Sequence, residues 1–300
     1  MNRRQFFALM AAGAFLGIPS IITKRGFAAS SNHSAKHLDA FQSRFGKLEA
    51  AAKGSLGAHI LDTASGKEYG YRSDERFMML STFKLMACAF VLHRGDDGVD
   101  SLDRRIPYAK EDLIDWSPIT EKHVDGLGMT LAELCEATIT TSDNTAANLI
   151  LSSFGGPAAL TAFVRKLGDD ITRFDRTESE MNVTSSDGLL DTTTPRATVG
   201  NLQKVVLGNV LSLSSSDQLQ RWLLNNTTGG RRLRAGIPTD WRIVEKTGTY
   251  KTGANDIGVI WPPHRPPIIV ATYLDDSSAS MAIRESTLAA IGELMAEITV

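Results

Sequence analysis

The spacing of the hydrophobic residues changes along this chain, and each change indicates a different kind of element. Over residues 37–52 the apolar side chains recur at helical spacing, which predicts an amphipathic helix. Residues 57–62 and 67–71 instead have the pattern of β-strands. Turn residues occupy positions 63–66 between them, so this segment predicts a β-hairpin.

The middle of the chain returns to a helical pattern, and the strand pattern reappears only near the end. Helices are predicted from the apolar run Leu85 to Leu92 onward to about Leu224, most clearly over 130–137, 144–152, 157–166 and 194–207. Strands are predicted over 241–246, 256–261 and 267–274, and a closing helix over 280–298.

This order of elements predicts an α/β (α+β) fold in which both ends of the chain build one sheet. The two early and three late strands would form a five-stranded antiparallel sheet, flanked by the N- and C-terminal helices. We expect a single domain over 31–300, with an α/β lobe from about 31–73 and 226–300 and an all-helical lobe from about 74–225. A cleft between two lobes is a usual place for a ligand site.

The composition favours a small-molecule substrate. The 300 residues carry 32 basic and 34 acidic side chains, a net charge of −2, and 42% hydrophobic residues, as in ordinary globular proteins. No long basic run is present, so neither nucleic acid nor an anionic membrane is expected as a partner. The sequence has no Cys or His spacing typical of a metal site, and we expect no metal or cofactor.

The N-terminus resembles an export signal. Arg3-Arg4 precedes an uncharged apolar run from Phe6 to Ile22, which predicts a twin-arginine signal peptide over residues 1–30. The run is shorter than the about 20 residues of a transmembrane helix, and glycines and a proline interrupt it. Ala28-Ala29-Ser30 offers a cleavage site. We therefore expect a periplasmic protein without stable membrane association; the alternative is an uncleaved membrane anchor.

Ser81 and Lys84 stand where the central helical pattern begins. Positions three apart share one face of a helix, so the hydroxyl and the amine would lie together. The Lys could accept the proton of the Ser if burial leaves the amine unprotonated, which would make Ser81 an activated nucleophile. Because a chain of this length contains roughly one Ser-x-x-Lys by chance, this motif alone is weak evidence.

Three further motifs follow in order, and together with the first they are specific. They are Ser142-Asp143-Asn144, Glu178-Ser179-Glu180-Met181-Asn182 and Lys246-Thr247-Gly248. With this set the chain resembles the class A serine β-lactamases, within the superfamily of penicillin-binding proteins and serine β-lactamases. The resemblance runs through the whole mature chain and implies the β-lactamase/transpeptidase-like fold.

The resemblance implies a role for each residue that forms or breaks bonds. Ser81 attacks the lactam carbonyl, and Ser142 passes a proton to the lactam nitrogen. Either Lys84 accepts the proton of Ser81 directly, or Lys84 acts beside a water held by Glu178; the two routes stay open. In the family Glu178 also activates the water that releases the acyl group, and Asn182 is its partner.

The same resemblance implies the substrate-binding residues. Asn144 holds the amide side chain of the substrate, and Lys246 and Thr247, in the turn that ends at Gly248, bind its carboxylate. The backbone N–H groups of Ser81 and Thr249 form the oxyanion hole.

Two further residues and one loop are carried over from the family. Trp116 matches an aromatic at the cleft entrance, and Arg232 matches an arginine aimed at the substrate carboxylate, with Arg231 as its alternative. The segment from Arg176 to Asp191 resembles an Ω-loop closed by an ion pair between its end residues.

Two positions depart from family patterns. Ser179 follows Glu178 where many members have a proline after a cis bond, so the bond at Glu178-Ser179 is either trans or a non-proline cis bond. Leu80 and Tyr250 stand where carbapenem-hydrolysing relatives have a disulfide, so carbapenemase activity is not supported.

The two cysteines lie at matching distances from the motifs. Cys88 comes seven residues after Ser81, and Cys135 comes seven before Ser142. Seven residues are two helical turns, so both thiols would point between the two motif helices, where a disulfide could join them. The alternative is a pair of reduced cysteines in the core.

These observations predict an exported, monomeric class A β-lactamase that hydrolyses penicillins or cephalosporins, small-molecule β-lactams, and so gives antibiotic resistance. One alternative is a penicillin-binding D-Ala-D-Ala peptidase, which would not be expected to carry the loop from Glu178 to Asn182. Another is a β-lactam sensor that stays acylated, which would need a membrane anchor and a signalling partner.

Overall fold

The computed structural model describes residues 27–124 and 126–299. The chain divides into two units, Met1–Phe41 and Gln42–Val300, and the architecture below is that of the second. Residues 1–26 of the predicted signal peptide lie outside the described residues, so that prediction is not tested. From Phe27 the backbone is helical, in α1 (Phe27–Ala52).

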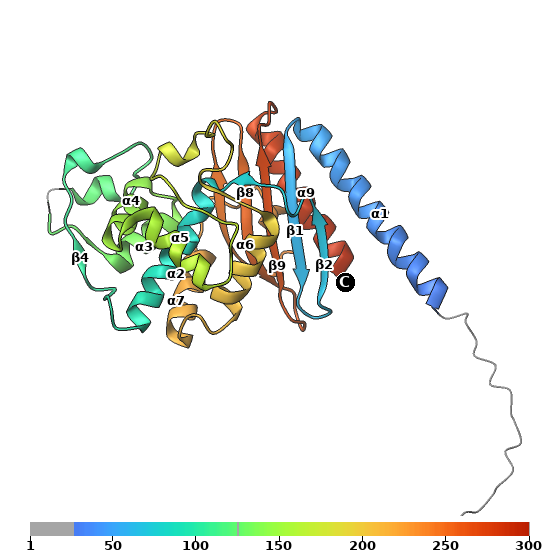
Figure 1. The fold of residues 1–300 in the computed structure, drawn as a ribbon, viewed down its shortest axis with the longest axis horizontal. Coiled ribbons are helices and arrows are strands. Elements are labelled where there is room, and N and C mark those ends of the chain that lie inside the picture. Colours follow the sequence, from blue (N-terminus) through green and yellow to red (C-terminus); the bar gives the residue numbers. More distant parts are fainter. Residues whose placement is uncertain (1–26, 125, 300) are drawn as a thin grey trace, which may run out of the picture. The chain divides into compact units, whose positions relative to one another are not determined.

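Both ends of the second unit contribute strands to one antiparallel sheet, as predicted. The early hairpin is β1 (Ser55–Asp62) and β2 (Lys67–Tyr71). The late strands are β7 (Arg242–Thr249), β8 (Ala254–Trp261) and β9 (Ile268–Asp275). The order β2-β1-β9-β8-β7 places the two ends of the chain side by side at the β1–β9 junction (Figure 1).

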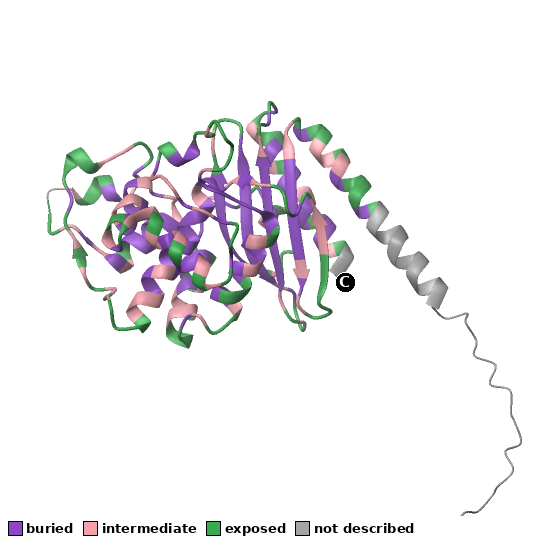
Figure 2. Cartoon of the chain, in the orientation of Figure 1, coloured by how far each residue is buried: buried purple, intermediate pink, exposed green. Residues whose placement is uncertain are grey.

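Helices cover both faces of this sheet. α6 (Pro195–Leu202) packs on β1, β8 and β9, and α9 (Met281–Thr299) packs on β8 and on the short helix α8 (Leu233–Gly236). As a result, β8 and β9 are buried along nearly their whole length (Figure 2). Burial on both faces explains why these strands are continuous apolar runs rather than alternating ones.

The segment between β2 and β7 forms a helical region around one central helix. α2 (Phe83–Asp96) is in contact with α3 (Leu131–Thr140), α4 (Asn144–Ser153), α5 (Gly156–Lys166) and α7 (Leu213–Leu224). Nine of the fourteen residues of α2 are buried, on all sides of the helix. A helix that is apolar all round must be enclosed by others, which is how the apolar run after Ser81 is satisfied.

Several short elements join these helices. The hydrophobic pattern did not predict them, except for the π-helical segment, which lies within the helix predicted over 194–207. Two two-stranded ribbons pair segments distant in sequence: β3 (Phe77–Met78) with β6 (Thr192–Thr193), and β4 (Arg105–Ile106) with β5 (Met129–Thr130). Among the described residues, four 3₁₀ turns and one π-helical segment are also present: η1 (Leu80–Thr82), η2 (Lys110–Asp112), η3 (Thr120–His123), η4 (Glu180–Asn182) and η5 (Gln203–Leu207).

Neither a membrane span nor a metal site stands out in the part of the chain that the structure describes. No single described helix is long and apolar enough to cross a membrane; α4 and α5 meet that criterion only as a pair, with a bend of 74° between them. Among the same residues, no three His, Cys, Asp or Glu side chains are grouped so that they could hold a metal ion.

The predicted disulfide is absent from the structure. Cys88 on α2 and Cys135 on α3 do lie together between the two helices, as their spacing predicted. Both are nevertheless free, fully buried thiols, and the Cys88 Sγ–H donates to the Cys135 carbonyl oxygen at 3.8 Å. Burial raises the pKa of the Cys135 thiol. The structure therefore has the alternative arrangement, two reduced cysteines in the core.

We expect the folded protein to resist alkylation by a thiol reagent and to take up two labels once it is unfolded. The physical reason is that a buried, protonated thiol is neither accessible nor nucleophilic. Intact mass before and after unfolding measures the number of labels, with Cys135→Ala, which should take up one label, as the control. A native protein that takes up no label even after unfolding without reductant would show that the disulfide forms.

Candidate active site

Ser81 lies in the 3₁₀ turn η1, directly before α2. The turn is closed by Thr82, whose hydroxyl donates to the Met79 carbonyl at 2.7 Å. Leu80, the residue before the serine, has a left-handed backbone with φ of 49°. The tight turn presents the Ser81 hydroxyl at the end of the helix, where the unpaired N–H groups of the first turn lie.

Lys84 is the buried centre of the site. Its side chain is fully enclosed, and its Nζ lies 2.9 Å from Ser81 Oγ, 2.6 Å from Asn144 Oδ1 and 3.1 Å from Glu178 Oε1. It also donates to the carbonyl and hydroxyl oxygens of Ser142, at 2.9 and 3.3 Å. Burial lowers the pKa of Lys84, and the Glu178 carboxylate partly offsets that shift.

Glu178 reaches the same centre from the opposite side. Its Oε1 accepts from the Ser81 hydroxyl at 3.2 Å, and its Oε2 accepts from Asn182 Nδ2 at 2.5 Å. Its backbone is held by Asn148, which donates to the Glu178 carbonyl at 2.7 Å and accepts from the Glu178 N–H at 2.9 Å. The Glu178–Ser179 bond is cis, one of the two forms that the sequence left open.

The loop that carries Glu178 is closed by the predicted ion pair. Arg176 Nε lies 2.7 Å from Asp191 Oδ2, and the fully buried Asp191 carboxylate also accepts from the backbone N–H groups of Asp175 and Arg176. The charge of Asp191 is therefore compensated by an arginine and two amides, which fixes both ends of the Ω-loop together.

β7 lies on the other side of Ser142 and contributes Lys246 and Thr247 to the site. The Lys246 Nζ donates to Ser142 Oγ at 3.1 Å and to the Thr247 carbonyl at 2.9 Å. Thr247 is itself hydrogen-bonded to Thr228 through their hydroxyls. Burial, with the nearby charge of Lys84, holds the pKa of Lys246 well below its usual value. Ser142 therefore lies between two buried lysine amines.

Gly248 allows β7 to approach η1, the turn that carries Ser81 and is called the nucleophile turn below. A Cβ at this position would lie 2.9 Å from Leu80 Cβ and 3.3 Å from the Ser81 backbone nitrogen. Any other residue would push the strand away from η1. The missing side chain thus places the next residue, Thr249, beside Ser81 at the end of the strand.

The loops before α4 form the opposite wall. Asp143 caps α4, and its buried carboxylate accepts from the N–H groups of Ala146, Ile119 and Thr120. Asn144 donates to the Asp115 carbonyl at 2.9 Å. The wall is thereby fixed by a buried carboxylate behind its surface.

Trp116 stands at the mouth of the site. Its side chain is 64% exposed, and its indole N–H donates to the Thr141 carbonyl at 2.9 Å. The backbone of Trp116 is left-handed, with φ of 64°.

These walls enclose a cleft of about 660 Å³. The lining includes most of the predicted site residues: Ser81, Trp116, Ser142, Asn144, Glu178, Asn182, Arg232, Thr247 and Thr249. The other three, Lys84, Lys246 and Gly248, are buried behind that surface. The structure thus brings the predicted residues together, while their roles stay predictions.

Comparison with known proteins agrees with this geometry. Residues 40–299 match the model of the β-lactamase enzyme family. The chain is 43% identical to β-lactamase L2 of Stenotrophomonas maltophilia, with 98% of each chain covered, and 41% identical to β-lactamase OXY-1 of Klebsiella oxytoca, with 97% of this chain and 96% of the relative covered.

A solved class A β-lactamase of the last common ancestor of Gram-negative bacteria superposes with a TM-score of 0.85 at 53% identity. The match covers 87% of this chain and all of that one. The chain belongs to the class A β-lactamases. β-Lactam hydrolysis follows from this membership.

In this β-lactamase it is Arg232, and not its neighbour Arg231, that faces the cleft from within. Arg232 is 2% exposed and donates to Thr249 Oγ1 at 2.6 Å and to the Gly248 and Asn255 carbonyls. Arg231 is 83% exposed and pairs with Glu285 at 3.7 Å. Burial lowers the pKa of Arg232 below its usual value.

Sequence reasoning missed residues that hold the predicted ones in place. The Asn148 side chain is hydrogen-bonded to both backbone groups of Glu178, and the Thr228 hydroxyl is hydrogen-bonded to that of Thr247. Glu285 contributes an acidic side chain to the cleft lining. The position of Asn148, four residues after Asn144 on the same helix, is a signal that could have found it. No motif or spacing in the sequence near Thr228 or Glu285 indicates that either residue belongs to the site.

Strained backbone gathers around the cleft of this β-lactamase. Leu80, Trp116, Ser142 and Asp191 all have φ between 49° and 64°, where residues other than glycine are uncommon. Such conformations persist where the surrounding contacts over-determine them, and they gather at functional sites.

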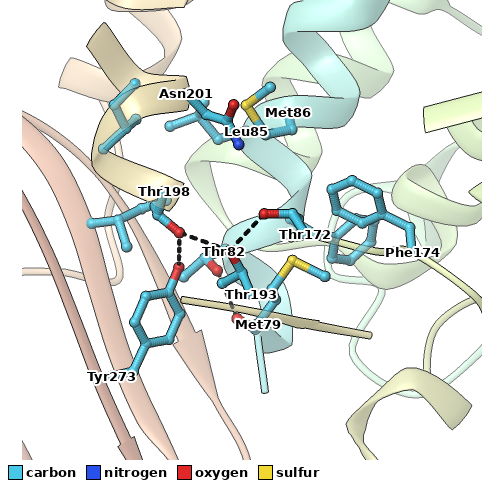
Figure 3. A pocket seen from close by; sticks show the side chains of 13 residues that line it. Met79, Thr82, Leu85, Met86, Thr172, Phe174, Thr193, Thr198, Asn201 and Tyr273 are labelled. Atoms are coloured by element: carbon cyan, nitrogen blue, oxygen red, sulfur yellow. Dashed lines mark hydrogen bonds between the residues drawn. The ribbon is translucent and has the colours of Figure 1, made fainter. Parts of the chain in front are cut away.

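A small cavity with a mostly apolar surface lies beneath η1, the turn that carries Ser81 (Figure 3). Its volume is about 20 Å³, enough for one water molecule. Hydroxyl groups bridge the elements around it: Tyr273 on β9 bonds Thr198 on α6 at 2.8 Å, Thr198 bonds Thr193 at 3.2 Å, and Thr193 bonds Thr172 at 2.7 Å (Figure 3). This network joins the sheet to the base of the Ω-loop.

The strand that leads into η1, β3, is anchored by a half-buried acid. Asp275, at the end of β9, accepts from the Met78 N–H at 2.8 Å. Burial raises the pKa of Asp275 to about 7, and the neighbouring Asp276 adds to that shift. Below about pH 7 the native protein therefore holds a proton on Asp275 that an unfolded chain loses near pH 4.

We expect Asp275→Asn to gain stability relative to the native enzyme as pH rises. Because the native pKa is raised, Asp275 contributes less to the free energy of unfolding as pH increases from about 4 to about 7, and the contribution is constant above that range. The asparagine has no proton to lose, so the difference grows by at most about 4 kcal/mol over this window. Urea unfolding at several pH values measures it. Asp276→Asn is the exposed control, and equal pH dependence in both variants would contradict the assignment.

Proposed function

We propose that this β-lactamase hydrolyses penicillins and cephalosporins through an acyl-enzyme on Ser81, released by a water that Glu178 activates. One observation carries this proposal: the Ser81 hydroxyl lies 2.9 Å from the Lys84 amine and 3.2 Å from the Glu178 carboxylate. A nucleophile in contact with both a lysine and a carboxylate has the groups for acylation and for release in one place.

In acylation, the Ser81 Oγ forms a bond to the lactam carbonyl carbon and gives up its proton. Lys84 accepts this proton directly if its amine is neutral, a state that burial favours. Glu178 is the alternative acceptor, because its Oε1 also contacts the hydroxyl. The negative charge on the carbonyl oxygen is stabilised by the backbone N–H groups of Ser81 and Thr249.

Ring opening breaks the carbon–nitrogen bond and leaves the nitrogen in need of a proton. Ser142 supplies it, because its hydroxyl faces the cleft and receives hydrogen bonds from both Lys84 and Lys246. Either amine can return a proton to Ser142 afterwards. The serine therefore works as a relay between the buried lysines and the leaving nitrogen.

The substrate carboxylate binds at the end of β7. Lys246 brings its charge to this edge, and the hydroxyls of Thr247 and Thr249 line the cleft there. Arg232 adds its charge through Thr249 Oγ1. On the opposite wall, Asn144 binds the amide side chain of the substrate, and Trp116 covers it at the entrance.

Release of the acyl group needs a water between Glu178 and the ester carbon. The Glu178 carboxylate takes a proton from that water, the hydroxide adds to the carbon, and the proton then returns to Ser81. Asn182 fixes the carboxylate and is the second partner for the water. This pair favours the hydrolase over the penicillin-binding peptidase and the sensor, both of which would lack a means of rapid release.

The working enzyme is a periplasmic monomer without cofactor, exported by the twin-arginine route and cleaved near residue 30. Arg3-Arg4 ahead of the apolar run supports export, and a cleft built by one chain supports the monomer. The mature part is a single domain over 31–300, with an α/β lobe from about 31–73 and 226–300 and a helical lobe from about 74–225.

Turnover of a chromogenic cephalosporin by residues 31–300, followed by intact mass, tests the proposed function. Many turnovers with a transient adduct on Ser81 are expected. A single burst with a lasting adduct would favour the sensor or the peptidase. Ser81→Ala should show neither turnover nor adduct, and serves as the control for non-enzymatic hydrolysis.

We expect Glu178→Ala to acylate and then to release product about 10²–10⁴-fold more slowly, because the general base for water is lost. A mass increase equal to the substrate should persist in this variant. Asn148→Ala loosens the backbone of Glu178 without removing the carboxylate. Its rate of product release should therefore fall between those of the native enzyme and Glu178→Ala. Release at the native rate in Glu178→Ala would remove Glu178 from this role.

A further inference from the structure

Two carboxyl side chains lie together in the interior, on the side of the sheet away from Ser142. Glu245 is on β7 and Asp256 on β8, and both are fully buried. Asp256 pairs with Thr247, two residues after Glu245, so the two acids are diagonal neighbours on one face of the sheet. None of the proposed catalytic steps uses either of them.

One oxygen of each carboxyl is paired and the other is not. Glu245 Oε1 accepts from Arg234 Nε at 2.8 Å, and Asp256 Oδ2 accepts from the Leu233 N–H at 3.1 Å. Glu245 Oε2 and Asp256 Oδ1 are buried, and no N–H or O–H group of the described residues donates to them. The strand register makes the two carboxyls diagonal neighbours on one face, a separation that side chains of this length can bridge.

The Glu245 carboxyl is also confined. A Cβ on Gly229 would lie 2.0 Å from Glu245 Oε1, so the loop before α8 packs directly against this group. The paired oxygen of Glu245 is therefore held against this loop. Two ionised carboxylates in this position would face each other with unpaired acceptors, which is a costly arrangement in the interior.

We propose that Glu245 and Asp256 share one proton in the folded enzyme and together carry a single negative charge. The proton lies between Glu245 Oε2 and Asp256 Oδ1 and satisfies both oxygens. Burial raises the pKa of both carboxyls, and for Asp256 the charge of Glu245 adds to this shift. Carboxyl pairs that share a site behave as one group with two separate titration steps.

Several charged groups face this pair from the elements around it. Arg232 and Arg234 approach from the loop and helix α8, and Asp256 is the main anionic influence on Arg232. Arg284 and Glu285 on α9 also act on Arg232. The charge of Asp256 also acts on Lys246, next to Glu245 on β7, and raises the pKa of its amine.

The shared proton affects substrate binding through Arg232. With one negative charge on the pair, the charges of Arg232 and Arg234 are not fully cancelled, and the cleft keeps an excess positive charge near Thr249 for the substrate carboxylate. Loss of the proton would cancel that excess. Glu245 and Asp256 are thus positioning residues, and this consequence rests on the proposed function.

Single amide variants reproduce the shared proton. In Glu245→Gln the side-chain oxygen can still accept from Arg234 while the NH₂ group donates to Asp256. In Asp256→Asn the oxygen can accept from Leu233 while the NH₂ group donates to Glu245. The double variant places two NH₂ groups against each other and leaves no acceptor between them. We therefore expect both single variants to fold stably and the double variant to be destabilised beyond the sum of the two.

The pH dependence of stability provides the decisive readout, measured in an Asp275→Asn background so that Asp275 does not titrate. Because the native pair holds one proton that the unfolded chain loses near pH 4, the melting temperature of the reference protein should fall, relative to either single variant, as pH rises above 4. An infrared band of a protonated carboxyl at neutral pH should be present in the reference and absent from both single variants. Parallel melting curves and an unchanged infrared spectrum would overturn the proposal.

Kinetics test the consequence for binding. The KM for a cephalosporin should rise in the reference protein as the pair loses its proton at alkaline pH, by about fivefold for one charge near the surface. Both single variants should lack this component. An identical rise in all three proteins would overturn the link to binding. The stability and infrared readouts need no turnover, so a failure of the proposed function is distinguishable from a failure of this inference.

Discussion

The buried amine of Lys84 is the interaction on which the rest of the site depends. It contacts oxygens from the nucleophile turn, from the loop before α4, and from the Ω-loop. A cation without water around it must be compensated by nearby oxygens and carboxylates, or it loses its proton. Because its oxygen partners come from three separate segments, the lysine holds Ser81, Ser142 and Glu178 at mutual contact distance.

The same requirement recurs at each wall of the cleft. Asp191 compensates Arg176 at the ends of the Ω-loop, and Asp143 accepts three backbone N–H groups beside Asn144. Buried ion pairs of this kind contribute modestly to stability as a whole, because desolvation offsets their attraction, but losing one partner is strongly destabilising. The buried charges behind the cleft walls therefore act mainly to fix one arrangement of the site residues, and contribute little net stability.

The sheet supplies the other fixed side of the cleft. β7 approaches the nucleophile turn closely because Gly248 has no side chain, and Asp275 at the end of β9 holds the strand that enters the turn. The backbone is left-handed at Leu80, Trp116 and Ser142, which lie around the same cleft. These residues are held in place by packed neighbours on two sides, which explains how an unfavourable local conformation persists.

The sequence by itself determined the order of the elements, the sheet built from both chain ends, and the four motifs, because periodicity and short motifs are local properties. The family resemblance added the expectation that an Arg176–Asp191 pair closes the Ω-loop, and the structure has that pair. Tertiary structure decided what depends on distant segments meeting. Asn148 grips Glu178 across thirty residues, Arg232 rather than Arg231 turns inward, and Cys88 bonds a carbonyl and not a second sulfur. The pairing of Glu245 with Asp256 is of the same kind, since only strand register and burial on one face of the sheet bring two like charges into contact.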